Sequence, residues 1–393
     1  MTPSPTRPSG LEPLSPDFYD GVRARLRDRA DAAGLDGLLV LAPGNVTYAT
    51  GWHFSRNERP IGLWIGTDGD PILLVPYLEY EDALGIPGIV VRTYEEFPGV
   101  TPAVLWMLDE VGARRMAIDT LDATLLADAT AILDHLDLVD HVRPERSVKS
   151  ETELSLTREA AHFADEVLER LLAVGGDIIA QGGTEADLLD DCTAHVRHLL
   201  AETHGAAFQG TKMGITASVH SGPRGALPHG SVTHRRPRPG EPVIAGIGCS
   251  IGGYHAESGV TLIVGEPTED QTSVMEVMAS AAAATVEALE ARRSCAEVNE
   301  AALAPIRDAG LGDAIRHRIG HGMGVEGHEA PWLAPGDDTS SGPGMVFSCE
   351  PGVYRPGLDG WRTIDTLIVG HDRVEVASGF LTRHPPGSRV IPC

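Results

Sequence analysis

The chain has 393 residues, which is enough for two domains that each bury a core of their own. Its formal net charge is −25, which argues against a nucleic-acid groove and against an anionic membrane surface as partners. Five scattered cysteines lack any C-x-x-C spacing, so neither a disulfide framework nor a thiolate zinc site is indicated and a reducing cytoplasm fits best.

The first part of the chain predicts an α/β layer architecture, because short apolar strands alternate with helical patterns. Residues 1–16 are rich in Pro and Ser, without an apolar leader, and predict a disordered start. No apolar run approaches the length of a membrane span, so a cytoplasmic protein is expected. Strands are expected at 37–42, 62–65, 71–75 and 88–91, and helices at 17–33, 101–111 and 121–134.

A polar, Pro-containing stretch over 142–150 has little to bury and predicts a domain boundary. We therefore expect a first domain over 17–148 and a second over 149–393. The second begins with a long helical pattern over 151–174, and Thr184 is placed to cap a further helix that follows it.

Histidines and carboxylates gather among glycines near the C-terminus. His321 and His328 fall in the stretch R-I-G-H-G-M-G-V-E-G-H-E-A-P, Glu350 precedes a Pro-Gly turn, and Arg362 stands three residues before Asp365. Buried strands are expected at 345–348 and 367–369, with both acids near strand ends, where a carboxylate is costly without a partner. Each residue alone is explained by a satisfied buried polar pair, but the set together indicates a site.

These motifs resemble the C-terminal half of the pita-bread fold shared by creatinase, prolidase, aminopeptidase P and methionine aminopeptidase. The family patterns read roughly G-H-G-x-G-x-x-x-H-E-x-P, x-E-P-G-x-Y and R-x-E-D-T. The resemblance implies that His321 and Glu350 bind metal and that His328 faces the substrate. Residues 45–51 resemble the creatinase-type N-terminal domain. The fold expected is thus α/β (α+β), a creatinase-like N-terminal domain followed by a pita-bread catalytic domain.

The metal site that the family pattern implies is incomplete in this sequence. Its two metal-binding aspartates fall on Gly246 and Glu257, its last glutamate falls on Ile364, and its active-site histidine falls on His229. A two-metal centre needs bridging carboxylates, and two of them are missing. What remains is Glu257, His321 and Glu350, the minimum for a mononuclear site.

Two explanations follow from this loss. The first, which we adopt as the expectation, is that the protein needs no metal or other cofactor, as in creatinase and ectoine hydrolase of the same fold. His229 then acts as general base and acid, because histidine titrates near neutral pH. The second is a single, weakly bound divalent metal on Glu257, His321 and Glu350.

The function expected is a metal-independent hydrolase that cleaves a C–N bond (amide, amidino or peptide) in a small nitrogen compound or short peptide. His229, His328, Glu350 and His321 are the candidate catalytic residues, and Glu257 and Arg362 are candidates for substrate binding. The alternatives are a Xaa-Pro peptidase with one residual metal, a non-catalytic peptide-binding module, and a lyase on the same histidine scaffold.

Assembly is expected to be a homodimer. In creatinase-like dimers the region after the first signature reaches the partner's pocket, and in this chain it carries Arg56 and Arg59. Either guanidinium is suited to hold a substrate carboxylate in bidentate fashion.

Overall fold

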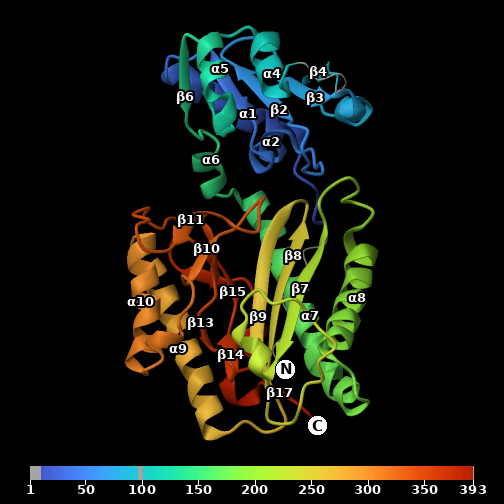
Figure 1. Ribbon diagram of the computed structural model, residues 1–393, viewed down its shortest axis with the longest axis vertical. Helices are drawn as coiled ribbons and strands as arrows, with labels where there is room; N and C mark the ends of the chain where they lie inside the picture. Colours follow the sequence, from blue (N-terminus) through green and yellow to red (C-terminus); the bar gives the residue numbers. More distant parts are fainter. Residues whose placement is uncertain (1–9, 96–100, 393) are drawn as a thin grey trace. The chain divides into compact units, whose positions relative to one another are not determined.

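The structure, a computed structural model, describes residues 10–95 and 101–392. The chain divides into two compact units, one over Pro13–Arg146 and one that begins at Ser147 and also takes in described residues 10–12 (Figure 1). The expected disordered start over 1–16 lies mostly outside the described residues. Where a polar linker is expected over 142–150, the chain forms the short helix α6 (Arg143–Ser147).

The N-terminal unit is built on one mixed six-stranded sheet, with strand order β4-β3-β2-β1-β5-β6. The pairs β1–β2 and β2–β3 are antiparallel, and the pairs on both flanks are parallel. Its strands are β1 (Gly37–Val40), β2 (Gly62–Gly66), β3 (Ile72–Pro76), β4 (Val90–Tyr94), β5 (Arg115–Ile118) and β6 (His135–Leu138).

Helices cover this sheet and bury an apolar core that includes Leu39, Met107 and Ile118. The amphipathic helix expected near the start is present, and the strands predicted over the first hundred residues all form near their expected positions. The helices are α1 (Pro16–Ala32), α2 (Pro43–Thr50), α3 (Tyr80–Ala83), α4 (Ala103–Val111) and α5 (Leu126–Ile132).

The C-terminal unit contains two sheets and a hairpin. A four-stranded sheet has the order β17-β9-β8-β7, a five-stranded sheet has the order β11-β10-β12-β15-β16, and β13 pairs with β14. The two sheets meet at an isolated bridge between Gly259 and Ile364. The strands are β7 (Gly214–Ser221), β8 (Pro242–Ile251), β9 (Tyr254–Val264), β10 (Gly320–Gly322), β11 (Glu329–Leu333), β12 (Val346–Cys349), β13 (Gly352–Arg355), β14 (Asp359–Arg362), β15 (Asp365–Val369), β16 (Val374–Val376) and β17 (Val390–Ile391).

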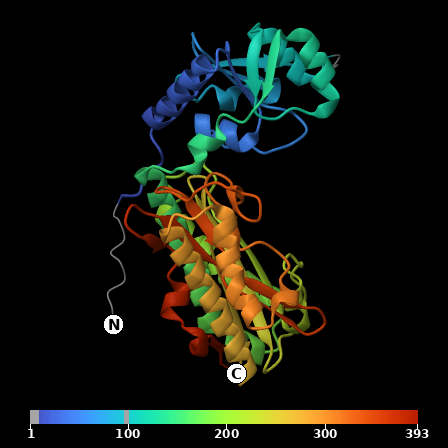
Figure 2. The same ribbon diagram turned by 90° about the vertical axis from the view of Figure 1, so that its left-hand side faces the viewer.

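Two pairs of helices flank these sheets. α7 (Glu151–Ala180) and α8 (Glu185–His204) pack on β7, β8 and β9, while α9 (Glu269–Glu290) and α10 (Cys295–Asp308) lie side by side over the other sheet. Figure 2 shows the second pair side-on. The C-terminal helix α11 (Phe380–Arg383) packs against α7.

Local sequence explains where the long helices begin. Ser150 and Thr184 each form a capping box with the acid three residues later, which satisfies backbone N–H groups at the first turn. Between α9, α10 and the five-stranded sheet lies an apolar core that includes Phe347 and Trp361. Among the described residues, none of the helices combines the length and the apolar character that crossing a bilayer requires.

Candidate metal centre and active site

Glu257 projects from β9 toward the junction of the two sheets. Its backbone N–H donates to Thr366 Oγ1 (2.8 Å), and that hydroxyl donates to the Glu257 carbonyl oxygen (2.7 Å). The side chain is 17% exposed, and Ser348 Oγ donates to Glu257 Oε2 at 2.9 Å. Thr366 thus fixes the backbone of Glu257 and Ser348 fixes its carboxylate, both from the five-stranded sheet.

His321, on β10, is fully buried and presents one ring nitrogen to the carboxylates. Its Nδ1 lies 3.0 Å from the Gly322 carbonyl oxygen, which only accepts, so Nδ1 carries the proton in the neutral ring. Its Nε2 is 3.3 Å from Glu350 Oε1 and 3.8 Å from Glu257 Oε2, yet it has no hydrogen-bond partner. In the neutral ring the Nε2 of His321 thus carries a buried lone pair that faces two carboxylates. A cation placed between this nitrogen and the carboxylate oxygens would satisfy all of them.

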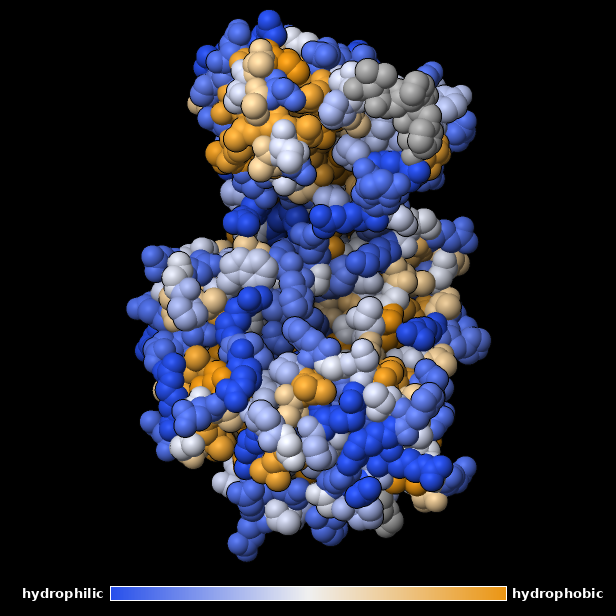
Figure 3. Space-filling model, viewed as in Figure 1, coloured by the Kyte–Doolittle hydropathy of each residue, from blue (hydrophilic) through white to orange (hydrophobic). Residues whose placement is uncertain are grey.

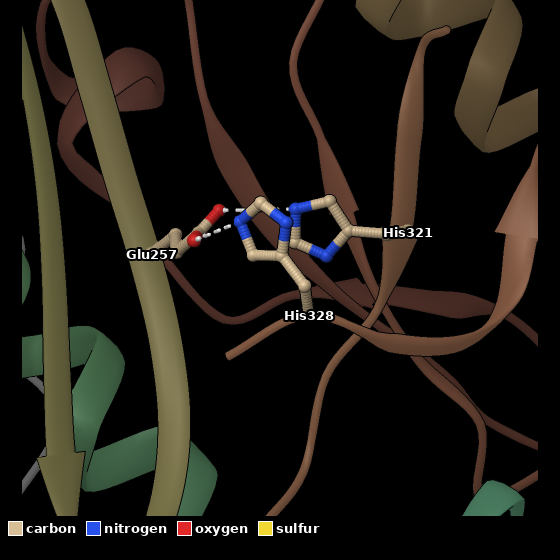
Figure 4. A group of neighbouring side chains, drawn as sticks. All are labelled: Glu257, His321 and His328. Carbon is tan, nitrogen blue, oxygen red and sulfur yellow. Dashed lines mark ion pairs between the residues drawn. The ribbon is translucent and has the colours of Figure 1, made fainter. Parts of the chain in front are cut away.

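His328 completes a cluster with Glu257 and His321 (Figure 4). It lies in the loop between β10 and β11, and its Nε2 is 3.8 Å from Glu257 Oε1. The candidate ligand atoms of the three residues all lie within 4.8 Å of one another. The set offers two imidazole nitrogens and one carboxylate, which is a donor set suited to zinc or another first-row divalent metal.

Glu350 follows β12 directly and approaches His321 from the next strand of the sheet. Its backbone N–H donates to the Ile319 carbonyl oxygen at 2.7 Å, which fixes the turn that carries the side chain. Burial acts to raise the pKa of Glu350, but the interaction with His321 outweighs burial and the pKa is lowered. Glu350 is therefore a fourth donor beside the cluster.

The electrostatics of the cluster favour a positive charge at its centre. Burial lowers the pKa of His321, but the Glu350 and Glu257 carboxylates outweigh it and raise the pKa overall. Burial, together with the charge of Glu350, raises the pKa of Glu257. Burial and the charge of His321 lower the pKa of His328. A proton or a metal ion at this point relieves the repulsion between the two carboxylates.

Gly246 and Ile364 occupy the two positions where the family pattern has further metal-binding acids. Gly246 lies on β8, opposite Gly259 on β9. Ile364 covers Gly259 so closely that a Cβ on that glycine would lie 2.6 Å from Ile364 Cγ1. The second half of the family's metal site is therefore lined by glycine and by an apolar side chain.

Arg362, at the end of β14, is buried beside these two residues. A Cβ built on Gly246 would lie 2.7 Å from Arg362 Nη2. Arg362 Nη1 donates to the Pro228 carbonyl oxygen at 3.4 Å, and Nε has no hydrogen-bond partner. The guanidinium thus reaches the space that an aspartate side chain at position 246 would enter.

His229 lies in the turn that follows the 3-10 helix Gly222–Ala226, and its side chain is exposed. The sequence analysis assigns proton transfer to this histidine, and the structure leaves its ring open to solvent. Its charge nevertheless contributes to the lowering of the pKa of both His328 and His317, which indicates that it lies near the site. His220 holds this turn through a contact between its Nε2 and the Gly230 carbonyl oxygen.

Arg56 and Arg59 belong to the N-terminal unit, in the segment between α2 and β2. Arg56 is exposed, and Arg59 pairs with Glu58 at 2.6 Å. His255, on β9, places its Nδ1 3.0 Å from the Gly324 carbonyl oxygen.

Sequence reasoning missed the residues that orient the ligands. Ser348 and Thr366 hold Glu257, and the His317 ring lies 2.8 Å from the Tyr354 hydroxyl beneath the site. Burial raises the pKa of Tyr354 to about 12, so its hydroxyl remains a donor at neutral pH. Alternation along β12 gives a signal for Ser348, since it is a polar residue in a buried apolar strand.

The fold and this residue cluster together define a two-domain protein of the creatinase/prolidase type. The chain belongs to metallopeptidase family M24, which matches residues 155–371, and the creatinase/prolidase N-terminal domain matches residues 23–141. The expected family and the expected two-domain α/β architecture are thereby confirmed.

Several relatives resemble the chain over most of its length. It is 33% identical over 349 residues to the probable dipeptidase PepE of Mycobacterium bovis, a match that covers 86% of this chain and 89% of that protein. The crystal structure of dipeptidase PepE from Mycobacterium ulcerans superposes with a TM-score of 0.80 at 26% identity, covering 97% of this chain and 100% of that one. The Xaa-Pro dipeptidase of Bacillus anthracis shares the fold, with a TM-score of 0.74 at 23% identity over 92% of this chain and 97% of that one.

These findings make the chain a hydrolase of the M24 peptidase type, and they correct one expectation. The prediction of a site without metal or cofactor is wrong, because the family is one of metallopeptidases and Glu257, His321 and His328 form a group able to hold a metal ion. The error came from counting ligands by position along the sequence. His328, assigned to the substrate by that count, lies close enough to Glu257 to serve as a further metal ligand.

Proposed function

We propose that the protein is a dipeptidase that hydrolyses a peptide C–N bond, of the Xaa-Pro type or a close relative of it, with a single divalent metal ion. Glu257 and His321 would hold the ion, with His328 and Glu350 completing its donor set. The observation that carries the proposal is the buried Nε2 of His321, which faces two carboxylates without a hydrogen-bond partner. The relatives named dipeptidases favour this alternative over a creatinase-like substrate.

Bound metal would polarise the scissile carbonyl group and lower the pKa of a water molecule, which supplies the nucleophile at neutral pH. The chain's own residues prepare the ligands for this role. The Gly322 carbonyl oxygen fixes the tautomer of His321, and Ser348 fixes the rotamer of Glu257. Such outer contacts keep each donor atom aimed at one point and lower the cost of ordering the site.

Hydrolysis adds water across the C–N bond, so the leaving nitrogen must gain a proton as the bond breaks. We assign this proton transfer to His229, because an imidazole can both accept and donate a proton and its charge reaches His328 and His317. An exposed ring on a turn is free to approach a bound dipeptide. His328, whose exposed ring adjoins Glu257, is available to donate a hydrogen bond to the substrate when it is not coordinated.

The test combines metal analysis with a substrate panel. The purified protein should carry close to one equivalent of a first-row divalent metal, lose turnover with a chelator and regain it with Mn²⁺, Co²⁺ or Zn²⁺. Release of free amino acids should be measured for Xaa-Pro dipeptides, for dipeptides without proline and for creatine. Protein that contains metal yet hydrolyses none of the dipeptides would contradict the proposal, and peptide binding without cleavage would favour a binding module.

A matched pair of variants ties the activity to the site. His321→Ala removes the buried ligand and should abolish both metal retention and turnover. His371→Ala removes an exposed histidine in the turn between β15 and β16 and should change neither. Equal behaviour of the two variants would disconnect the proposed centre from the reaction.

A further inference from the structure

Trp332 lies on the face of the five-stranded sheet that carries the metal cluster. In the antiparallel pair β10–β11, Trp332 is directly opposite His321, and side chains at directly opposite positions project from the same face of a sheet. The next residue, Leu333, points the other way and belongs to the core beside α9 and α10. Trp332 is only half-buried, so it can contact a molecule bound next to His321.

Arg318 is held against this tryptophan. Its guanidinium carbon Cζ lies 4.5 Å from the centroid of the Trp332 ring, and its Nε donates to the Gly320 carbonyl oxygen at 3.0 Å. One N–H group and one flat face of the guanidinium are thereby engaged, which fixes the direction of the side chain. Among the described residues, its two terminal amino groups make no hydrogen bond and Arg318 forms no ion pair.

The guanidinium of Arg318 adjoins the metal cluster. Burial is the main cause that lowers the pKa of His328, and the charge of Arg318 adds to this lowering. Arg318 is half-buried and therefore open to a ligand, whereas Arg362 is almost completely buried and donates to the Pro228 carbonyl oxygen. The structure thus presents one oriented cation, with unused donors, beside the residues that would hold the metal ion.

A dipeptide carries a carboxylate at the distance that such a cation can serve. Three bonds separate the scissile carbonyl carbon from the carbon of the C-terminal carboxylate, a path of about 4.3 Å. The group that binds this carboxylate must therefore lie close to the metal cluster. A guanidinium can bind a carboxylate through two parallel N–H···O bonds, whereas a longer or amidated peptide offers one neutral carbonyl oxygen and an N–H group there.

We propose that Arg318, oriented by Trp332 and the Gly320 carbonyl oxygen, binds the C-terminal carboxylate of the substrate and so restricts the enzyme to dipeptides. This inference rests on the proposed function. Arg318 is then a specificity-determining residue, and Trp332 positions it. Because the guanidinium is already ordered in the free protein, less side-chain freedom is lost when the carboxylate binds.

The first test compares substrates that differ only beyond the scissile bond. The dipeptide that is cleaved fastest should be compared with its C-terminal amide and with the tripeptide extended by one alanine. The native enzyme, loaded with metal, should prefer the free dipeptide by about 10–100-fold in kcat/KM, as expected for hydrogen bonds to a charged group. In calorimetry, the released C-terminal amino acid should likewise bind more tightly than its amide.

Arg318→Gln should remove this preference and leave the chemistry intact. The KM for the dipeptide should rise by about 10–100-fold while kcat and metal content stay near the native values, because the lost contact serves binding only. Cleavage of the amide should hardly change. Trp332→Leu should act in the same direction, whereas Trp332→Phe keeps an aromatic face and should act less. Arg316→Gln is the matched control, because Arg316 is an exposed arginine whose Nη1 donates to the Asp313 carbonyl oxygen at 2.6 Å.

Three results would overturn the inference while leaving the peptidase proposal intact. The first is a native enzyme that cleaves the amide as well as the dipeptide, a result that does not depend on the folding of any variant. The second is a loss in Arg318→Gln that is equal for both substrates, as a structural arginine would give. The third is a preference that survives in Arg318→Gln, which would return the carboxylate to Arg56 or Arg59. A metal-loaded protein that cleaves no dipeptide would instead overturn the proposed function.

Discussion

The imidazole rings of His321 and His328 are stacked, with their centroids 3.8 Å apart and their planes inclined by 24°. The stack brings both Nε2 atoms to 3.8 Å from the Glu257 carboxylate, although one ring is buried in a strand and the other belongs to an exposed loop. Two ring nitrogens therefore converge on one carboxylate, which is the geometry that a metal ion requires.

Replacing His328 should weaken metal binding without unfolding the protein. His328→Ala removes a side chain that is 57% exposed, so the core loses little packing. We expect a higher dissociation constant for Mn²⁺ in calorimetry and an unchanged melting temperature of the metal-free protein. An unchanged dissociation constant would leave Glu350, and not His328, as the third ligand.

Ser348 orients Glu257 and should matter although it does not contact the metal. Ser348→Ala removes the hydroxyl that donates to Glu257 Oε2, and loss of such an outer contact typically costs about 10–100-fold in metal affinity or activity. Ser341→Ala, which removes another buried hydroxyl that donates to the Leu289 carbonyl oxygen and not to Glu257, is the control and should affect stability only. Equal metal affinity of both variants would argue against a positioning role.

His229 should govern the chemical step and not substrate binding. His229→Ala should lower kcat by about 10²–10⁴-fold with little change in substrate dissociation constant, as loss of general acid–base catalysis does. Metal content should stay at the native value, because no ligand is removed. If His229→Ala turned over substrate at the native rate, the proton would have to come from another group.

Asp365 should make stability depend on pH. Burial raises the pKa of Asp365 to about 7 from a value of 3.8 in the unfolded chain, although Ser378 Oγ donates to its carboxylate at 2.9 Å. Between these values the folded chain holds a proton that the unfolded chain has lost. The free energy of unfolding therefore falls as pH rises through this window. The protein keeps the full stability that protonated Asp365 allows only below the pKa of the unfolded chain.

The variant Asp365→Asn cannot lose that proton. Between about pH 5 and about pH 8, urea titrations should show the native protein losing about 3 kcal/mol more than Asp365→Asn. Asp372→Asn, at an exposed aspartate in the turn between β15 and β16, should follow the native curve. A native curve parallel to that of Asp365→Asn would show that Asp365 titrates normally.

The homodimer remains a prediction, and the surface of the N-terminal unit suggests how to test it. Figure 3 shows apolar residues on that unit, and Leu126, Leu138 and Val139 are among its exposed apolar side chains. Leu138 ends β6, which is an edge strand and so has an unpaired side. Light scattering should give twice the chain mass of 41.7 kDa, and Leu138→Asp should lower it. A native protein that scatters as a single chain would refute the dimer and remove the basis for Arg56 or Arg59 in a partner's site.

The sequence by itself determined the elements and the family. Capping at Ser150 and Thr184, the apolar strands of the first domain and the burial of Val346–Cys349 are decided by neighbours within a few residues, so they can be read along the chain. The motifs around His321, Glu350 and His229 likewise carried the resemblance to the pita-bread fold, which the M24 match confirms. The loss of acids at Gly246 and Ile364 was visible in the same way.

Only the tertiary structure decided which side chains meet around those two positions. Glu257 and Ser348 come from different sheets and meet 91 residues apart in the chain, and no local pattern specifies that contact. The convergence of His328 on Glu257 and the approach of Arg362 to Gly246 also arise where the two sheets join at Gly259 and Ile364. Side-chain direction at such a junction depends on the packing of both sheets at once, because a long side chain turns toward whatever space its neighbours leave open. Counting ligands along the sequence therefore gave a metal-free site, whereas the folded chain brings the donors for one metal ion together.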